Sequence, residues 1–480
     1  MDHLSRCDCG CEDVPSARGI FIPAAFGKLS RERGDSRLSV PSPLPFSSGK
    51  GNRACFLAVL MWLVVGASAM AAEYLTPNDV VLPSEAASAE TVLQSAGKQS
   101  IRFMGLDVFP HAAASVMYDD NVLITHTNPI SDVEWSLLPG VTVVAGDVST
   151  AFSGAVTLEQ LRDLLRYSLV DDSDKPNRFF GVDFTPAFNL FMENGRFDNI
   201  DYNAGMTAGY TFSRLSIGLD QDFSRVAIKD NDIGDRVTLI RFLTNLRLRY
   251  QLTDRTLFEV LARYLNSGYG NSIYQGYQEF RNEDWVDRRV GGKLDVGVGG
   301  AFGWVYPDIN PNQTYQQALV RGIYQVSGKL DVRTYLGIEL REYGGGISDT
   351  VDPVLNLAVI YQFRPPTTFT LEAHRQDAPS PTGYYNYQTY GFSGGVKEKL
   401  FDRLFASLSA GYDFVDYKQL SNVLIAARSD NYYSVKVGFE YEVDQHLTAS
   451  LFYIFQGDSS NQERYTYTDN MVGVRLGWKY

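Results

Sequence analysis

The sequence predicts an all-β protein, a transmembrane antiparallel β-barrel of about 18 strands (16–18) with short periplasmic turns and longer outer loops. Three observations lead to this fold class. The chain ends in a strand with one apolar face, most of the chain repeats a unit of strand, turn, strand and loop, and small and charged residues share one face of these strands. No change of composition divides the repeating part, so we expect one large domain.

The last ten residues, 471–480, alternate between apolar side chains and polar or small ones. Successive side chains of a strand point to opposite faces, so one face of this segment is apolar. The ending resembles the C-terminal signal of bacterial outer-membrane β-barrels, in which an aromatic last residue follows apolar residues at every second position. The resemblance implies that five residues face lipid and form the signal for the barrel assembly machinery: Val472, Val474, Leu476, Trp478 and Tyr480.

The repeated unit begins near residue 106 and consists of strands of about ten residues, joined alternately by tight polar turns and by longer loops rich in Asp, Asn, Gly and Ser. Short turns on one side and long loops on the other are typical of outer-membrane barrels. We expect strands at 112–118, 132–146, 178–192, 201–213, 214–227, 236–252, 255–267, 285–298, 300–306, 315–328, 329–343, 351–363, 367–376, 385–399, 403–417, 430–443, 446–457 and 465–480.

The polar face of these strands is the candidate functional site. In a water-soluble sandwich the charged residues would lie on the outside, whereas a wide barrel needs its polar face inside a water-filled lumen. Charges on this face would set the charge selectivity of the lumen, although some of them would pair and stiffen the wall. The candidate residues are Arg247, Arg249, Lys293, Asp295, Asp331, Arg333, Glu339, Arg341, Lys436, Glu440 and Arg475.

Small and aromatic residues on the same face have simpler explanations. An inner aromatic residue such as Tyr335 is expected to pack within the wall, and stacking on sugar rings is the alternative. Glycines relieve crowding and allow the strand coiling that closure requires. The glycines expected on this face include Gly205, Gly209, Gly337, Gly411 and Gly473.

The chain before residue 106 divides into two parts. Residues 1–72 are an upstream segment and signal peptide, because Lys50 and Arg53 precede an apolar run that ends in small residues, with Ala69 and Ala71 fitting a cleavage site. The apolar run is shorter than the roughly 20 residues of a membrane-spanning helix. Residues 73–105 are a periplasmic connector, and 106–480 form the outer-membrane barrel. All four cysteines precede residue 73, so the mature chain needs no disulfide or thiolate metal site.

The composition narrows the possible partners. The formal net charge of −13 makes the chain a poor ligand for nucleic acid, and the 29 Tyr and 28 Phe suit strands and membrane interfaces. We expect no cofactor and no bound metal. Two acidic residues and an amide in the segment 118–122 have the oxygen chemistry of a calcium site, but turns at strand ends favour Asp and Asn in any case.

One insertion breaks the strand pattern. Leu158, Leu161, Leu164 and Leu165 recur at helical spacing within 158–166, on the side that the strand order makes periplasmic. The segment either caps a turn, which is the simpler interpretation, or enters the barrel as a plug.

Catalysis is not expected. His374 shares its predicted face with Glu372 and Gln376, but barrel lumens hold many such polar neighbours. Neither a nucleophile elbow nor an H-E-x-x-H motif appears in the sequence.

Several segments resemble the β-barrel porin 2 family of bacterial outer-membrane proteins. They are 110–111, 118–122, the run to 138–140, 213–223, 428–431 and 457–461. The resemblance covers about residues 105–480 and implies a channel for hydrophilic solutes in the bacterial outer membrane, with exopolysaccharide export among the functions of the family. Its expected partners are outer-membrane lipid, the assembly machinery and polysaccharide. The alternative is a structural or surface-binding barrel that transports nothing.

Overall fold

The computed structural model describes residues 100–146, 158, 161–162, 177–325, 329–345, 347–364, 366–420 and 426–480. The upstream segment, the predicted signal peptide and residues 73–99 of the connector lie outside these residues. Of the predicted helix at 158–166, only Leu158, Leu161 and Arg162 are described, and all three are helical.

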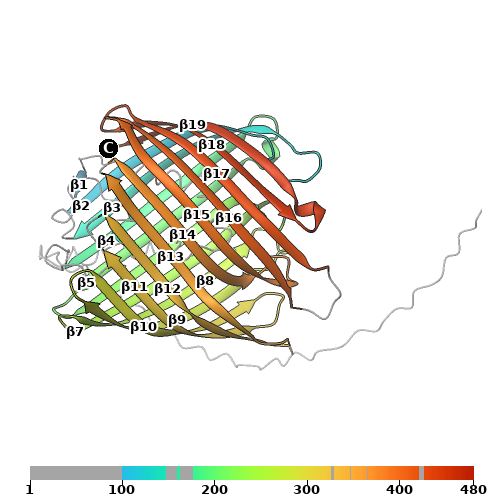
Figure 1. The fold of residues 1–480 in the computed structure, drawn as a ribbon. Helices are drawn as coiled ribbons and strands as arrows, with labels where there is room; N and C mark the ends of the chain where they lie inside the picture. Colours follow the sequence, from blue (N-terminus) through green and yellow to red (C-terminus); the bar gives the residue numbers. More distant parts are fainter. Residues whose placement is uncertain are drawn as a thin grey trace, which may run out of the picture. The chain divides into compact units, whose positions relative to one another are not determined.

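Eighteen antiparallel strands form one closed barrel, which confirms the predicted fold class. Each strand pairs with the next along the chain, and the last strand pairs with the first long one, so that β2 and β19 lie side by side (Figure 1). The short strand β1 (Ile101–Phe103), inside the predicted connector, pairs with the beginning of β2. The barrel strands are β2 (Leu106–Asp119), β3 (Asp132–Gly146), β4 (Arg178–Phe191), β5 (Asn199–Thr211), β6 (Leu215–Asp230), β7 (Asp235–Thr253), β8 (Thr256–Tyr269), β9 (Tyr277–Val290), β10 (Leu294–Pro307), β11 (Gln313–Gln325), β12 (Leu330–Tyr343), β13 (Thr350–Arg364), β14 (Thr367–Pro379), β15 (Tyr385–Phe401), β16 (Leu404–Gln419), β17 (Arg428–Glu442), β18 (Leu447–Ser460) and β19 (Tyr467–Lys479).

Closure explains why a chain of middling hydropathy can form this sheet in a membrane. Each of the strands from β2 to β19 has two hydrogen-bonded neighbours, so no edge leaves backbone N–H and C=O groups without partners in hydrocarbon. Large apolar side chains point outward along the strands, as in Ile338 and Val298, which are 60% and 58% exposed. Among the residues that the structure describes, no helix is both long and apolar enough to span a bilayer.

The alternation at the C-terminus has the predicted geometry. Along β19 the odd-numbered residues from Tyr467 to Lys479 are buried, whereas every even-numbered residue from Val472 to Trp478 is exposed. This period of two arises because the strand pleat sends successive side chains to opposite faces.

One pair of predicted strands was misplaced. The sequence predicted strands at 285–298 and 300–306, but β9 ends at Val290 and β10 runs from Leu294 to Pro307. The turn between them contains Gly291, whose φ of +72° lies in the left-handed region that glycine tolerates best. The dipeptide Gly291-Gly292 was the signal that should have placed the turn here.

The two faces of mid-barrel strands predict opposite responses to the same substitution. Phe392 on β15 points outward and is 58% exposed, whereas its neighbour Ser393 faces inward, directly across from Glu372. We expect Phe392→Arg to lower the free energy of unfolding in lipid vesicles by about 2–4 kcal/mol, because it exposes a charge to hydrocarbon. Ser393→Arg should change it little. Urea titration measures both, and equal effects would contradict the assigned faces.

Candidate functional site: the lumen of the barrel

The inner wall holds most of the residues predicted to line the lumen. Strand pairing places these residues on the same face as the buried polar side chains of neighbouring strands. Lys293 is the exception, since it is exposed in the turn between β9 and β10. Those on the inner face are Arg247, Arg249, Asp295, Asp331, Arg333, Glu339, Arg341, Lys436, Glu440 and Arg475.

Several of these charges form ion pairs with residues that the sequence did not single out. The Arg249 guanidinium donates to the Glu259 carboxylate, which also accepts from Arg321 Nη1 at 2.9 Å. Arg321 Nε donates to Asp287 Oδ1 at 2.8 Å, and the guanidinium lies 4.3 Å from the centre of the Trp285 ring. This chain of pairs joins four strands, so these charges stiffen the wall as well as lining it.

The structure also brings together some of the predicted residues. Arg333 Nη2 donates to Asp331 Oδ2 at 2.8 Å, and Arg341 Nε donates to Glu339 Oε1 at 2.7 Å. Both pairs are two residues apart on β12, the spacing that places side chains on one face of a strand. Glu440 is instead 3.9 Å from Lys397 on β15, two strands away. The sequence missed the cross-strand partners because strand register is not visible in one chain.

The inner aromatic residue Tyr335 packs within the wall. Its ring centre lies 5.5 Å from that of Trp285, and its hydroxyl accepts a hydrogen bond from Arg281 Nη2 at 2.6 Å. Trp285 itself is 1% exposed.

The helical residues of the insertion contact the inner wall. A Cβ at Gly205 would overlap the Leu158 side chain, and one at Gly181 would overlap Leu161. Arg162 Nε donates to Asp220 Oδ1 at 2.8 Å, and its Nη2 pairs with Asp222. These contacts support the second of the two sequence interpretations, in which the segment enters the barrel.

Strands β6 and β7 continue beyond their neighbours and fold across the lumen. β6 pairs with β5 only as far as Arg225, and β7 pairs with β8 only from Leu239, yet β6 and β7 stay paired to Asp230 and Asp235. We call residues 231–234, which join these strands, the β6–β7 tip. The Asn231 side chain of this tip accepts a hydrogen bond from Tyr467 on β19 at 2.6 Å.

Arg428 on the far wall holds the β6–β7 tip. Its Nη1 donates to the Asp232 backbone oxygen at 2.7 Å and to Asp232 Oδ1 at 3.0 Å, and its Nε donates to Asp430 Oδ2 at 2.8 Å. The guanidinium lies 4.2 Å from the Tyr417 ring centre and 3.4 Å from that of Tyr465. Burial raises the pKa of Asp232 to about 7 even though the Arg428 charge acts to lower it.

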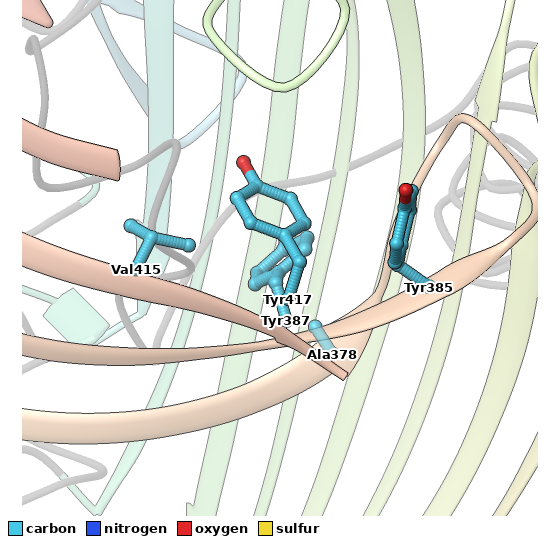
Figure 2. Close-up of a cluster of buried hydrophobic side chains, with 5 residues drawn as sticks. All are labelled: Ala378, Tyr385, Tyr387, Val415 and Tyr417. Atoms are coloured by element: carbon cyan, nitrogen blue, oxygen red, sulfur yellow. The ribbon is translucent and has the colours of Figure 1, made fainter. Parts of the chain in front are cut away.

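A second hairpin also leaves the wall. β14 pairs with β13 only as far as Arg375, while its pairing with β15 continues to Pro379. The buried side chains Ala378, Tyr385 and Tyr387 of this hairpin pack on Val415 and Tyr417 of β16 (Figure 2).

Residues 380–384, the β14–β15 tip, connect this hairpin to the opposite loops. Gln275, between β8 and β9, donates from Nε2 to the Ser380 backbone oxygen at 2.9 Å and from its backbone to Pro381 at 2.7 Å. The Ser380 hydroxyl also lies close to the Asp232 carboxylate of the β6–β7 tip. The two tips therefore meet at the long-loop end of the barrel, and we call this contact region the constriction.

The acidic segment considered for calcium lies beside the constriction. Carboxylate oxygens of Asp119, Asp120 and Asp469 are within 4.8 Å of one another. The Lys229 ammonium lies between two of them, 2.7 Å from Asp119 Oδ2 and 2.6 Å from Asp469 Oδ2. A lysine of the chain itself therefore supplies the positive charge there.

His374 shares a face of β14 with Glu372, as the sequence predicted, and lies beside Asp413 of β16. Its Nε2 lies 3.7 Å from Asp413 Oδ1, across Gly391, and both side chains are buried. Glu372 lies on the same strand but faces Ser393.

Comparisons with known proteins give distant structural likenesses alone. No protein-family model and no curated protein matches the sequence. Solved structures that show such a likeness include Acinetobacter baumannii OccAB3 (8% identity, TM-score 0.42, covering 78% of this chain and 99% of that one). Pseudomonas aeruginosa OpdQ has 8% identity and a TM-score of 0.42, covering 79% and 99%. The outer membrane protein OpdK of the same organism has 8% identity and a TM-score of 0.40, covering 78% and 99%.

The location follows from the fold itself. Closed antiparallel barrels with an apolar outer surface and a polar interior are the β-sheet proteins of bacterial outer membranes. This chain is such a barrel, with large apolar side chains on the outside and ion pairs within.

Proposed function

We propose that the protein is a porin-like channel that lets small hydrophilic solutes cross the bacterial outer membrane. The observation that carries the proposal is the division between the two faces of the strands. The outer face is apolar, whereas the inner face carries charged residues from the short-turn end to the long-loop end. A barrel that served only as a membrane anchor would gain nothing from so many charges inside it, since an apolar interior packs well.

The constriction limits the size of the solutes that can pass. The β14–β15 tip is bonded to the loop between β8 and β9 and the β6–β7 tip is bonded to β17, so both tips narrow the passage. The sequence resemblance also supports membership of the β-barrel porin 2 family, and with it the export of polysaccharide. No contact among the described residues favours polysaccharide over small solutes, so small hydrophilic solutes are the proposed cargo.

The sequence also supports a route to the membrane. Residues 50–72 contain basic residues, then an apolar run, then small residues, which is the order of a signal peptide. This order supports secretion of the protein to the periplasm as a mature chain that begins near residue 73. The alternating C-terminal residues from Val472 to Tyr480 support recognition by the barrel assembly machinery.

The second candidate is a structural barrel that transports nothing. The observation that favours it is that segments of the protein contact the inner wall of the lumen at both of its ends. Arg162 is bonded to the inner wall from the short-turn side, and the constriction lies on the long-loop side.

Conductance in a planar lipid bilayer separates the two candidates. Protein expressed from its full-length sequence and extracted from outer membranes should show stable, stepwise openings. Circular dichroism and heat-dependent mobility on gels would establish that the sample is folded. Folded protein without any openings would overturn the channel and support the structural barrel.

A further inference from the structure

The constriction holds more carboxylates than cations. Lys229 binds Asp119 and Asp469, and Arg428 binds Asp232 and Asp430. A fifth acid, Asp458, lies on β18 beside them. We call these five acids the carboxylate cluster: Asp119, Asp232, Asp430, Asp458 and Asp469.

Asp458 faces into this cluster. Strand register places it directly across from Tyr432 on β17 and from Tyr467 on β19. It is diagonal to Asp430 on β17. Diagonal residues on one face of an antiparallel pair lie within side-chain reach of each other.

No side chain of the described residues forms a hydrogen bond or an ion pair with Asp458. It is 1% exposed, and its neighbours are the backbone N–H groups of Asn431 and Ser459 and, at longer range, the Arg428 charge. One oxygen of Asp469 and one of Asp430 are likewise buried without a hydrogen-bond partner. A buried carboxylate without a partner is costly, and a cation that supplied donors would remove that cost.

The two cations already present show which chemistry fits. The Lys229 ammonium lies between two carboxylates, and the Arg428 guanidinium lies between carboxylates with tyrosine rings against it. Tyrosine rings attract cations through their negative faces. Tyr467 stands directly across from Asp458, on β19.

We propose that the carboxylate cluster makes this channel select cationic solutes, and that Asp458 binds the ammonium or guanidinium group of an organic cation as it passes the constriction. This inference rests on the proposed function, because selection needs a passage. The charge excess in a narrow, low-dielectric place favours cations and repels anions.

Reversal potentials in a potassium chloride gradient test the charge preference. The wild-type channel should prefer cations to anions by more than about threefold, and Asp458→Asn should reduce that preference by about half. The matched control is Asp402→Asn, which removes the same charge from the exposed short turn between β15 and β16. It should leave the preference almost unchanged.

Liposome swelling tests the solute class with probes of similar size. Arginine hydrochloride should enter faster than sodium glutamate, and Asp458→Asn should narrow the difference. An uncharged pentose should enter both variants at the same rate. An anion preference in the wild-type channel, or an equal effect of Asp458→Asn and Asp402→Asn, would overturn the cationic selection but leave the channel in place.

A folded but silent protein would overturn the proposed function instead. Binding of arginine to the detergent-solubilised protein, measured by calorimetry, then decides the remaining claim about Asp458. Binding that Asp458→Asn abolishes and Asp402→Asn preserves would support the cation site. Absence of binding to the wild-type protein would reject it.

Discussion

Replacing Arg428 by alanine is expected to raise the single-channel conductance on the order of twofold and to make the current unsteady. The guanidinium joins the β6–β7 tip to β17, through Asp232 on one side and Asp430 on the other. Its loss leaves two buried carboxylates unpaired, which costs about 3–5 kcal/mol. The tip is the part of the structure that can move to relieve this cost, because β6 and β7 have no outer neighbours there.

Limited digestion with trypsin provides a second measurement. Lys229 and Arg236 flank the tip and are mostly buried in the wild-type protein. We expect cleavage at these two residues in Arg428→Ala and not in the wild type. Arg428→Lys is the matched control, since it keeps the charge but loses the planar fork that reaches both acids. Unchanged conductance and unchanged protease resistance in Arg428→Ala would show that the tip is held by other contacts.

The second large effect is expected at the other end of the lumen. Arg162→Ala should destabilise the contact between the helical residues and the inner wall by about 3–5 kcal/mol, because Asp220 and Asp222 are then buried without their cation. An insertion that obstructs the passage would also leave it when this contact is lost, and the single-channel conductance would then rise. Single-channel recording and urea unfolding of the same variant measure both quantities.

A cycle of substitutions separates this ion pair from a general loss of charge. The triple variant Arg162→Ala, Asp220→Asn, Asp222→Asn should recover much of the lost stability, because no charge is left unpaired. Arg333→Ala, which removes another lumen arginine from a half-buried pair with Asp331, should have a smaller effect. A triple variant no more stable than Arg162→Ala would contradict the assigned pairing.

The sequence was sufficient to predict the faces of the barrel. Alternation at period two is local, so each strand shows it without knowledge of its neighbours, as in β19. The C-terminal residue Tyr480 then set which face was outside. The Gly291-Gly292 turn was missed because the apolar residues on either side of it continue the same alternation.

The constriction was not predicted because it depends on contacts between distant residues. Arg428 and Asp232 are 196 positions apart in the chain. Strands β6 and β7 alternate in the usual way up to the β6–β7 tip, so nothing in their pattern shows that their ends leave the wall. Arg428 was noticed only as part of a family resemblance, and its partners appear only when the barrel is closed.

Lys229 links the constriction to the order in which the barrel forms. Its ammonium bridges Asp119 on β2 and Asp469 on β19, the two strands whose pairing closes the sheet. These carboxylates come together only after the first and last strands have met. The selective part of the lumen therefore takes its final form as the last event of assembly, and an unclosed barrel inserted in the membrane lacks it.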